Sequence, residues 1–184
     1  MVSPAAERGR EVRRRLLQAA AELIPERGWT AVSTRILAER AGVTPSVVHY
    51  HYPSVNALLN EAVTAAMRDF TAGLRPLLDA AGSPAEVVEA LLASVERSAG
   101  EEPGLLLFME AFLAAARDEP LREAIAGAFL EFRNELARRF DEQGVPSPER
   151  TAAAVMAVID GLVLHRALAP APDGTAEVLR RLVG

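Results

Sequence analysis

The 184-residue chain contains no cysteine. This absence excludes a disulfide framework, cysteine-ligated zinc, iron–sulfur clusters and thiol catalysis. All 20 basic residues are arginine, and we attribute the lack of lysine to GC-rich coding. Aromatic residues make up 5% of the chain, too few for the stacking platforms that hold single-stranded nucleic acids. No apolar run approaches the roughly 18–20 residues of a membrane span.

The composition is nevertheless that of a folded protein. Half of the residues are hydrophobic and 24% are charged, a balance typical of globular rather than disordered chains. The first 15 residues are polar and arginine-rich, without the apolar stretch of a secretory signal peptide. Because cysteine is also absent, we expect a protein of the reducing cytoplasm.

Charge is distributed unevenly along the chain. Residues 1–60 hold eight Arg and five Glu, a net charge of +3, whereas the remaining residues hold 12 Arg and 20 acidic residues, a net charge of −8. A basic N-terminal region on an acidic body favours contact of that region with a polyanion. A chance fluctuation of surface charge explains the same numbers, so charge alone does not decide between the two.

Apolar residues recur at spacings of three and four along most of the chain, as they do in amphipathic helices. One such stripe consists of Leu121, Ile125, Phe129, Phe132, Leu136 and Phe140. No long stretch alternates with a period of two, and Ala and Arg favour helix. We therefore predict an all-α fold of about nine helices, with breaks at Gly28, Gly42, Pro53 and residues 82–84, 100–104, 119–120, 144–148 and 170–174.

The first helix is expected to run from Arg8 to Glu26 and to end at Gly28. We interpret Trp29, the only tryptophan, as a cap on the small N-terminal core. The expected inner face of this helix consists of Val12, Leu16, Ala19, Ala20 and Leu23, which leaves Arg10, Arg13 and Arg14 mostly outside.

The segment from Ser33 to Tyr52 has the pattern of a helix-turn-helix. Ser33 is a suitable N-cap for a helix that ends before Gly42, where a residue without Cβ can adopt a positive φ. Thr44 is a second N-cap, and Pro45 suits the first position of a short second helix. Two short helices joined by a tight glycine turn form the DNA-binding helix-turn-helix.

In such a motif the N-terminal side chains of the second helix reach base edges in the major groove. Short hydroxyl and apolar side chains bind several bases, so the expected sequence preference is soft. Arg35, His49 and Tyr50 are placed to bind phosphates or base edges. The predicted DNA-binding residues are Ser33, Thr34, Arg35, Thr44, Pro45, Ser46, Val47, His49 and Tyr50.

Five pieces of sequence follow one another at fixed spacings between Arg13 and Leu59. They are Arg15-Leu16-Leu17 with Ala19-Ala20, Glu26-Arg27-Gly28, Leu37 to Thr44, Tyr52-Pro53-Ser54 and Ala57-Leu58-Leu59. In this order they resemble the N-terminal signature of the tetracycline-repressor (TetR) family of bacterial transcriptional regulators. The resemblance implies an all-helical homodimer with a DNA-binding domain, residues 1–53, and an effector-binding and dimerisation domain, residues 54–184.

Two positions depart from the family pattern. His49 stands where members usually carry a phosphate-binding Tyr, although a histidine can still donate such a bond. Val55 stands where members usually carry Lys, and valine cannot neutralise a phosphate. His49 and His51 do not suggest a metal site, because residues two apart on a helix face different ways. We therefore predict no metal and no cofactor.

The resemblance places an effector pocket between the fourth and eighth helices, and its apolar lining suits a hydrophobic effector. The alternative is that the same residues form plain core. Glu110 interrupts an apolar run; we favour a solvent-facing carboxylate over one that binds a cationic or hydroxylated ligand. The predicted ligand-binding residues are Met67, Phe70, Leu74, Leu91, Phe108, Glu110, Phe112 and Phe129.

The segment from Thr151 to Ala169 is apolar on nearly all sides over its first three turns. A helix of this kind must be buried on every side, which a small domain cannot easily achieve alone. We predict that it pairs with residues 176–183 and with a second copy in a four-helix bundle. The predicted interface residues are Val155, Val158, Ile159, Leu162 and Leu179.

Together these features predict a ligand-responsive repressor that is released from a roughly palindromic DNA operator by a small effector. The alternative is an all-helical scaffold protein without sequence-specific DNA binding, or an enzyme. We do not expect an enzyme, because the sequence offers no thiol, no Ser–His–acid set and no glycine-rich phosphate loop. Replacement of Thr44 and Ser46 by Ala would distinguish a repressor from a scaffold.

Overall fold

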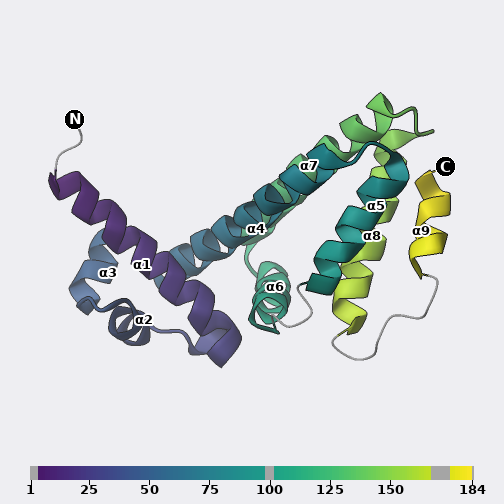
Figure 1. Ribbon diagram of the computed structural model, residues 1–184. Helices are drawn as coiled ribbons and strands as arrows, with labels where there is room; N and C mark the ends of the chain where they lie inside the picture. The colour runs from purple at the N-terminus through teal and green to yellow at the C-terminus, as the bar shows by residue number, and fades with distance from the viewer. Residues whose placement is uncertain (1–3, 98–101, 167–174, 184) are drawn as a thin grey trace. The chain divides into compact units, whose positions relative to one another are not determined.

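The computed structural model describes residues 4–97, 102–166 and 175–183 (Figure 1). Within these ranges the chain forms nine α-helices and one 3-10 turn, with no strand, which confirms the predicted all-α fold. The predicted break at 170–174 lies outside the described residues, as does part of the break at 100–104. The elements are α1 (Pro4–Arg27), η1 (Trp29–Ala31), α2 (Thr34–Ala41), α3 (Pro45–His51), α4 (Val55–Ala80), α5 (Pro84–Arg97), α6 (Glu102–Ala115), α7 (Glu119–Glu142), α8 (Pro148–Arg166) and α9 (Thr175–Val183).

The prolines inside helices do not end them. Helix α1 continues through Pro25 for two further residues and is followed by Gly28, whose φ is 81°. Helix α4 begins after Ser54, whose Oγ accepts a hydrogen bond from the Ala57 backbone N at 3.1 Å, and continues through Pro76 to Ala80. None of the helices in the described part of the chain combines the length and apolar character that a membrane crossing requires.

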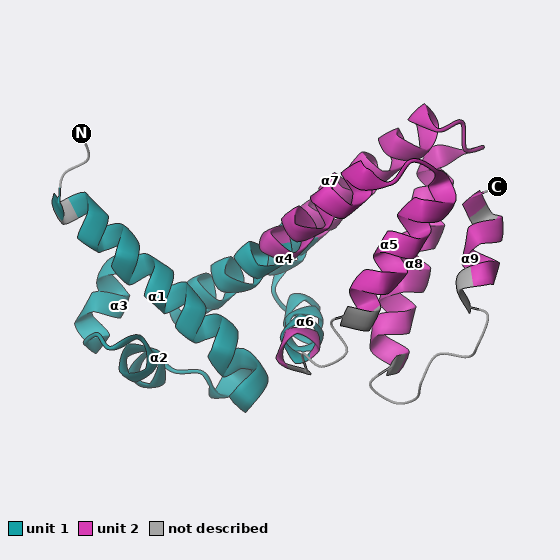
Figure 2. Ribbon diagram, in the orientation of Figure 1, with its two compact units in different colours: residues 1–67, 106–125 teal, residues 68–105, 126–184 magenta. Residues whose placement is uncertain are grey.

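The chain divides into two compact units (Figure 2). Unit 1 consists of residues 1–67 and 106–125, and unit 2 of residues 68–105 and 126–184. The long helices α4 and α7 therefore contribute to both units, and most of α6 groups with the N-terminal helices. The predicted domain boundary between residues 53 and 54 stays a prediction.

The core of unit 1 forms where α1 packs against α2 and α2 packs against α3. The predicted inner face of α1 is buried at Leu16, Ala19, Ala20 and Leu23, while Val12 is half-buried. Trp29 is half-buried in η1. Because α2 and α3 are too short to be stable alone, their positions depend on this packing against α1.

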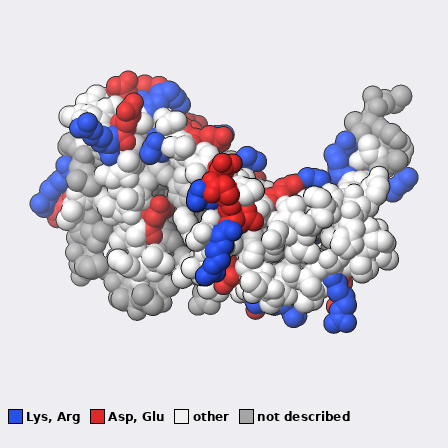
Figure 3. Space-filling view, turned by 180° about the vertical axis from the view of Figure 1, so that it is seen from behind, with Lys and Arg blue, Asp and Glu red and all other residues white. Residues whose placement is uncertain are grey.

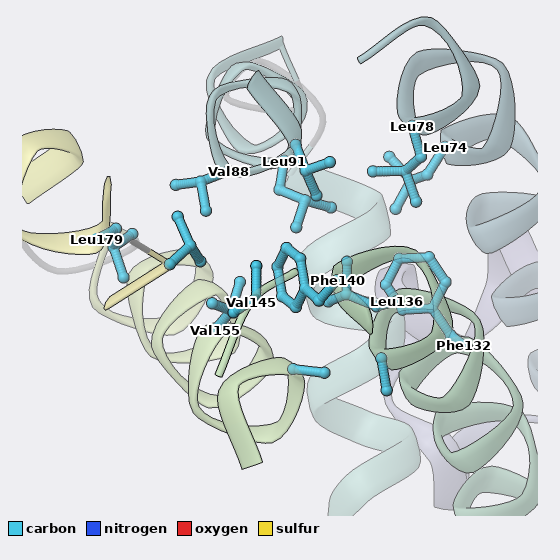
Figure 4. Close-up of a cluster of buried hydrophobic side chains, with 14 residues drawn as sticks. Leu74, Leu78, Val88, Leu91, Phe132, Leu136, Phe140, Val145, Val155 and Leu179 are labelled. Carbon is cyan, nitrogen blue, oxygen red and sulfur yellow. The ribbon is translucent and has the colours of Figure 1, made fainter. Parts of the chain in front are cut away.

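The core of unit 2 is one cluster of side chains from α4, α5, α7, α8 and α9 (Figure 4). Helices α5, α8 and α9 contact one another, and Phe140 of α7 is completely buried in the cluster. The predicted stripe along α7 is buried except for Phe129, which is half-buried. The labelled members of the cluster are Leu74, Leu78, Val88, Leu91, Phe132, Leu136, Phe140, Val145, Val155 and Leu179.

Candidate nucleic-acid interface and effector site

The turn between α2 and α3 is built by local backbone chemistry. Ser33 caps α2, since its side chain accepts a hydrogen bond from the Ile36 backbone N. Gly42 ends α2 in the left-handed conformation, with φ 63° and ψ 41°, and its backbone N–H donates to the carbonyls of Ala38 and Glu39. The predicted cap and the predicted positive φ of the glycine are both confirmed.

A buried seam behind this turn holds α2 against α3. Leu37, Ala38 and Ala41 of α2 are buried, as is Val48 of α3, and Val43 is half-buried between them. Burial of a leucine or valine side chain, as at Leu37 and Val48, contributes about 1.5–3 kcal/mol to folding. The seam therefore fixes which side of α3 is covered and leaves the other side to solvent.

Thr44 occupies the N-cap position of α3, but the prediction that its side chain caps the helix is wrong. Its hydroxyl makes no capping bond and instead lies 2.9 Å from the Ser46 hydroxyl, where either oxygen can donate. Pro45 occupies the first helical position, as predicted. The two hydroxyls that were predicted to contact bases therefore satisfy each other in the free protein.

The predicted DNA-binding residues lie at the start of α2 and along α3. Seven are exposed: Ser33, Arg35, Thr44, Pro45, Ser46, His49 and Tyr50. Thr34 and Val47 are half-buried. Tyr50 is 86% exposed and its ring packs edge-on against His51. The structure thus gathers five of these residues on the short helix α3, with Thr44 at its N-cap, and their contact with DNA stays a prediction.

Several arginines of the basic N-terminal region are engaged by glutamates of the same region. Arg14 pairs with Glu11 one turn away, while Arg40 reaches from α2 to Glu22 at 3.2 Å and to Glu26 at 2.6 Å. Figure 3 shows charges of both signs side by side on the face that it draws. Hydrogen bonds from Arg40 hold the pKa of Glu26 below its usual range. These ion pairs make Arg14 and Arg40 less available to phosphates.

The long-range pairs were missed from the sequence, because only Glu11 and Arg14 are close enough along the chain to predict as a helical pair. Arg13 likewise pairs with Glu61, 48 residues away. Within the described residues, no group of three His, Asp or Glu side chains is placed to hold a metal ion.

The predicted effector residues fall in both units. Met67, Phe108, Glu110 and Phe112 belong to unit 1, whereas Phe70, Leu74, Leu91 and Phe129 belong to unit 2. Leu74 and Leu91 are buried in the core of unit 2, which matches the plain-core alternative for these two residues (Figure 4). Phe70 and Phe112 are 44% and 54% exposed. Effector contact at these positions stays a prediction.

A hollow of about 410 Å³ does occur in the structure, but it lies on α1 and not among the predicted effector residues. It is lined by Glu7, Arg8, Glu11, Val12 and Arg15. It is open to solvent and lies along a single helix, unlike the clefts that bury most of a ligand's surface. The hollow therefore does not replace the predicted effector site.

Glu110 does not face solvent, so the favoured interpretation of this residue was wrong. It is half-buried, and its Oε2 accepts a hydrogen bond from the Trp29 backbone N at 2.8 Å. A Cβ placed on Gly28 would lie 3.8 Å from the same carboxylate. This is an ordinary van der Waals distance, so the position favours glycine for its positive φ and not for lack of space.

Two of the five predicted interface residues are already covered by their own chain. Val155 is completely buried and Leu179 is 1% exposed, because α9 packs over α5 and α8 within unit 2. Their assignment to a surface that contacts a second copy is therefore corrected. Val158, Ile159 and Leu162 are half-buried at the edge of the same core, and their role in dimerisation stays a prediction.

Helices α2 and α3, joined by a tight glycine turn and exposed on one side of α3, have the structure of a DNA-binding helix-turn-helix. A family model described as "Bacterial regulatory proteins, tetR family" matches residues 16–62, and one described as "Tetracyclin repressor-like, C-terminal domain" matches residues 82–184. The second match alone spans more than half of the chain. The chain therefore belongs to the TetR family of DNA-binding transcriptional regulators, which are not enzymes, and the scaffold alternative is not favoured.

Individual relatives agree with this assignment. The chain is 28% identical over 162 residues to the HTH-type transcriptional regulator BetI of Rhizobium meliloti (strain 1021), which covers 87% of this chain and 80% of BetI. It is 33% identical to the transcriptional regulator SCO7518 of Streptomyces coelicolor A3(2), with a TM-score of 0.81 over 94% of this chain and 98% of that chain. It is 27% identical to the multidrug binding protein EbrR, whose structure is complexed with ethidium, with a TM-score of 0.72 and coverage of 94% and 99%.

Proposed function

We propose that this chain is a homodimeric repressor that binds a roughly palindromic operator and is released by a small, apolar and cationic effector. The observation that carries the DNA-binding part is the asymmetry of α3. Thr44, Pro45 and Ser46 are exposed at its N-terminus, while Val48 is 2% exposed against α2. This arrangement suits insertion of the exposed side into a major groove.

Contacts of these side chains specify sequence only weakly. Ser and Thr hydroxyls accept from or donate to several bases, and Pro or Val can contact a thymine methyl. The bond between Thr44 and Ser46 must be exchanged for bonds to bases, which reduces the net gain of each contact. A second copy that supplies the same helix about 34 Å away adds the remaining specificity.

A homodimer is supported by the small and apolar side chains that α8 leaves uncovered on either side of the exposed Asp160. Ala154, Ala157 and Leu164 are exposed on this helix, and Leu164 is 46% exposed. Small residues allow a second helix to approach closely, as in a four-helix bundle. Two-fold pairing through this face would set the distance between the two reading helices.

A cationic effector is supported by two observations of different kinds. The relative EbrR binds ethidium, a planar aromatic cation, and residues 61–184 carry a net charge of −8. A lipophilic cation gains from apolar and aromatic side chains and from nearby carboxylates. The effector shifts DNA binding only through its different affinity for the two forms of the protein, typically 1–3 kcal/mol.

The DNA-binding part is tested by selection from a random duplex library at about 0.1 M salt, followed by sequencing. We expect a palindromic motif from the wild type. The double variant Thr44→Ala, Ser46→Ala should lose about fivefold or more in affinity for that motif, since each hydroxyl hydrogen bond contributes a net of about 0.5–1.5 kcal/mol. Thr71→Ala is the matched control, because its hydroxyl bonds only to the Arg68 carbonyl of its own helix. An unchanged motif in the double variant contradicts the proposal.

The effector part is tested with tetraphenylphosphonium and tetraphenylborate, two ions of similar size and opposite charge. The cation should raise the melting temperature of the free protein and weaken its binding to the selected duplex, because a ligand that prefers one form stabilises that form. The anion should do neither. Equal effects of both ions, or tighter DNA binding with the cation, contradict a cationic effector.

A further inference from the structure

The C-terminal end of the recognition helix α3 is held by a cluster of three side chains from three parts of unit 1. Tyr52 follows α3 directly as its C-cap, with its backbone N donating to the Val48 carbonyl at 2.9 Å. Arg13 lies on α1 and Glu61 lies on α4. The cluster therefore joins the C-terminal end of α3 to both α1 and α4.

The geometry of the cluster is specific. The Arg13 guanidinium lies 4.6 Å from the centre of the Tyr52 ring. Its Nε donates to Glu61 Oε1 at 3.1 Å and its Nη2 pairs with Glu61 Oε2, so the contact is bidentate. The Tyr52 hydroxyl donates to Glu61 Oε1 at 3.3 Å. A planar guanidinium that stacks on a ring and forks onto a carboxylate fixes orientation as well as distance.

The cluster has a buried side and an exposed side. Tyr52 is 3% exposed, whereas the side chains of Arg13 and Glu61 are 45% and 37% exposed. Burial raises the pKa of the Tyr52 hydroxyl, and the Glu61 carboxylate raises it further, so the hydroxyl keeps its proton and remains a donor. The ring is thus fixed in the core while its two polar partners stay at the surface of the head.

We propose that Arg13 and Glu61 are positioning residues, which orient the recognition helix by clamping Tyr52 between α1 and α4. The proposal rests on the proposed function, because it assigns the residues that hold the proposed reading helix. It also gives Arg13 a role other than phosphate contact, which is the role that an exposed arginine in the basic N-terminal region suggests. The competing explanation is that Arg13 contacts a DNA phosphate and that Glu61 restrains it. The two explanations predict opposite changes in DNA affinity when Glu61 is substituted.

The substitution Glu61→Gln distinguishes the two explanations by the direction in which specific affinity for DNA changes. If Arg13 orients α3, loss of the carboxylate loosens the clamp, and specific affinity for the selected duplex falls by about twofold to fivefold, as expected for one partly exposed ion pair. If Arg13 is a restrained phosphate contact, the same substitution frees it, removes a negative charge and raises affinity. A rise in specific affinity overturns the proposal.

Two further variants separate the parts of the clamp. Arg13→Gln should lower specific affinity at least as much as Glu61→Gln, because it loses the ion pair and the ring contact together. Arg14→Gln is the matched control: it removes the same charge from the next residue, whose partner Glu11 lies on the same helix. Tyr52→Phe keeps the ring and loses only the hydroxyl bond, so a change of about twofold or less is expected. Equal losses for Arg13→Gln and Arg14→Gln overturn the proposal.

Hydrogen exchange in the free protein tests positioning without DNA. Glu61→Gln and Arg13→Gln should raise amide exchange in residues 47–52 by about threefold to tenfold, while exchange in α5 stays unchanged. A uniform rise in α3 and α5 would indicate a general loss of stability and overturns the proposal, as does no rise at all. Should library selection give no motif, the proposed function fails, but this exchange result still decides the role of the clamp.

Discussion

The helix-turn-helix and the α8–α9 pair show two different ways in which sequence determines structure. In the first, Ser33, Gly42 and Pro45 stand at the backbone positions that their chemistry predicts. Each position depends on neighbours within about four residues. In the second, Val155 and Leu179 are apolar and buried, but by their own chain and not by a second copy. Local backbone chemistry thus predicts a position, whereas apolar character predicts burial without predicting the partner.

The largest effect is expected where an apolar residue is covered by its own chain. Leu136 is completely buried in the core of unit 2, and Leu136→Ala should lower the free energy of unfolding by about 2.7–5 kcal/mol, through lost burial and a residual cavity. The matched control is Leu113→Ala on α6, where the side chain is 63% exposed and a change within about 0.5 kcal/mol is expected. Urea unfolding followed by helical circular dichroism measures both.

The comparison of Leu136→Ala with Leu113→Ala also tests whether the apolar surface of α6 is covered by another chain in solution. A loss well above about 1 kcal/mol for Leu113→Ala would mean that the α6 surface is covered in solution, in contrast to the single chain. Dependence of that loss on protein concentration would identify a second copy as the cover.

A second comparison uses the same chemical change at two glycines. Gly42→Ala places a Cβ on a residue with φ 63°, and the left-handed conformation costs such a residue about 1–2 kcal/mol. Gly73 lies exposed within α4 with no atom within 4 Å of an added Cβ, so Gly73→Ala should stabilise the protein by up to about 1 kcal/mol. Thermal unfolding should therefore shift in opposite directions. Equal shifts would contradict a turn that depends on the glycine.

The third prediction concerns Glu110, which the structure bonds to the Trp29 backbone N. Glu110→Ala leaves that partly buried N–H without its acceptor and should cost about 1 kcal/mol. Glu110→Gln keeps an acceptor of the same size but loses the charge, so about half of that cost is expected. If Glu110→Gln abolished the response to tetraphenylphosphonium with no greater loss of stability than this, the carboxylate would bind the effector as well as the Trp29 backbone N.

What could be predicted follows the same division. The fold class and the glycine turn between α2 and α3 depend on spacing and capping within a few residues, and they were predicted correctly. The bonds of Arg13 to Glu61 and of Glu110 to Trp29 join positions 48 and 81 residues apart, and no local pattern indicates them. The cap at Thr44 failed for another reason: a second hydroxyl two residues away competes for the first.

The smallest change in stability is expected at the N-caps, where it distinguishes a side chain that makes a capping hydrogen bond from one that does not. The Ser54 hydroxyl accepts from the Ala57 backbone N at 3.1 Å, so Ser54→Ala should cost about 0.5–1 kcal/mol in the free energy of unfolding. Thr44 holds the equivalent position before α3 but makes no capping bond, so Thr44→Ala should cost only a few tenths of a kcal/mol. Equal costs would show that the Thr44 hydroxyl leaves Ser46 and caps α3 in solution. In that case residue type at an N-cap would be sufficient to predict the capping bond. The hydrogen bond between the Thr44 and Ser46 hydroxyls would then not be the main arrangement in the free protein.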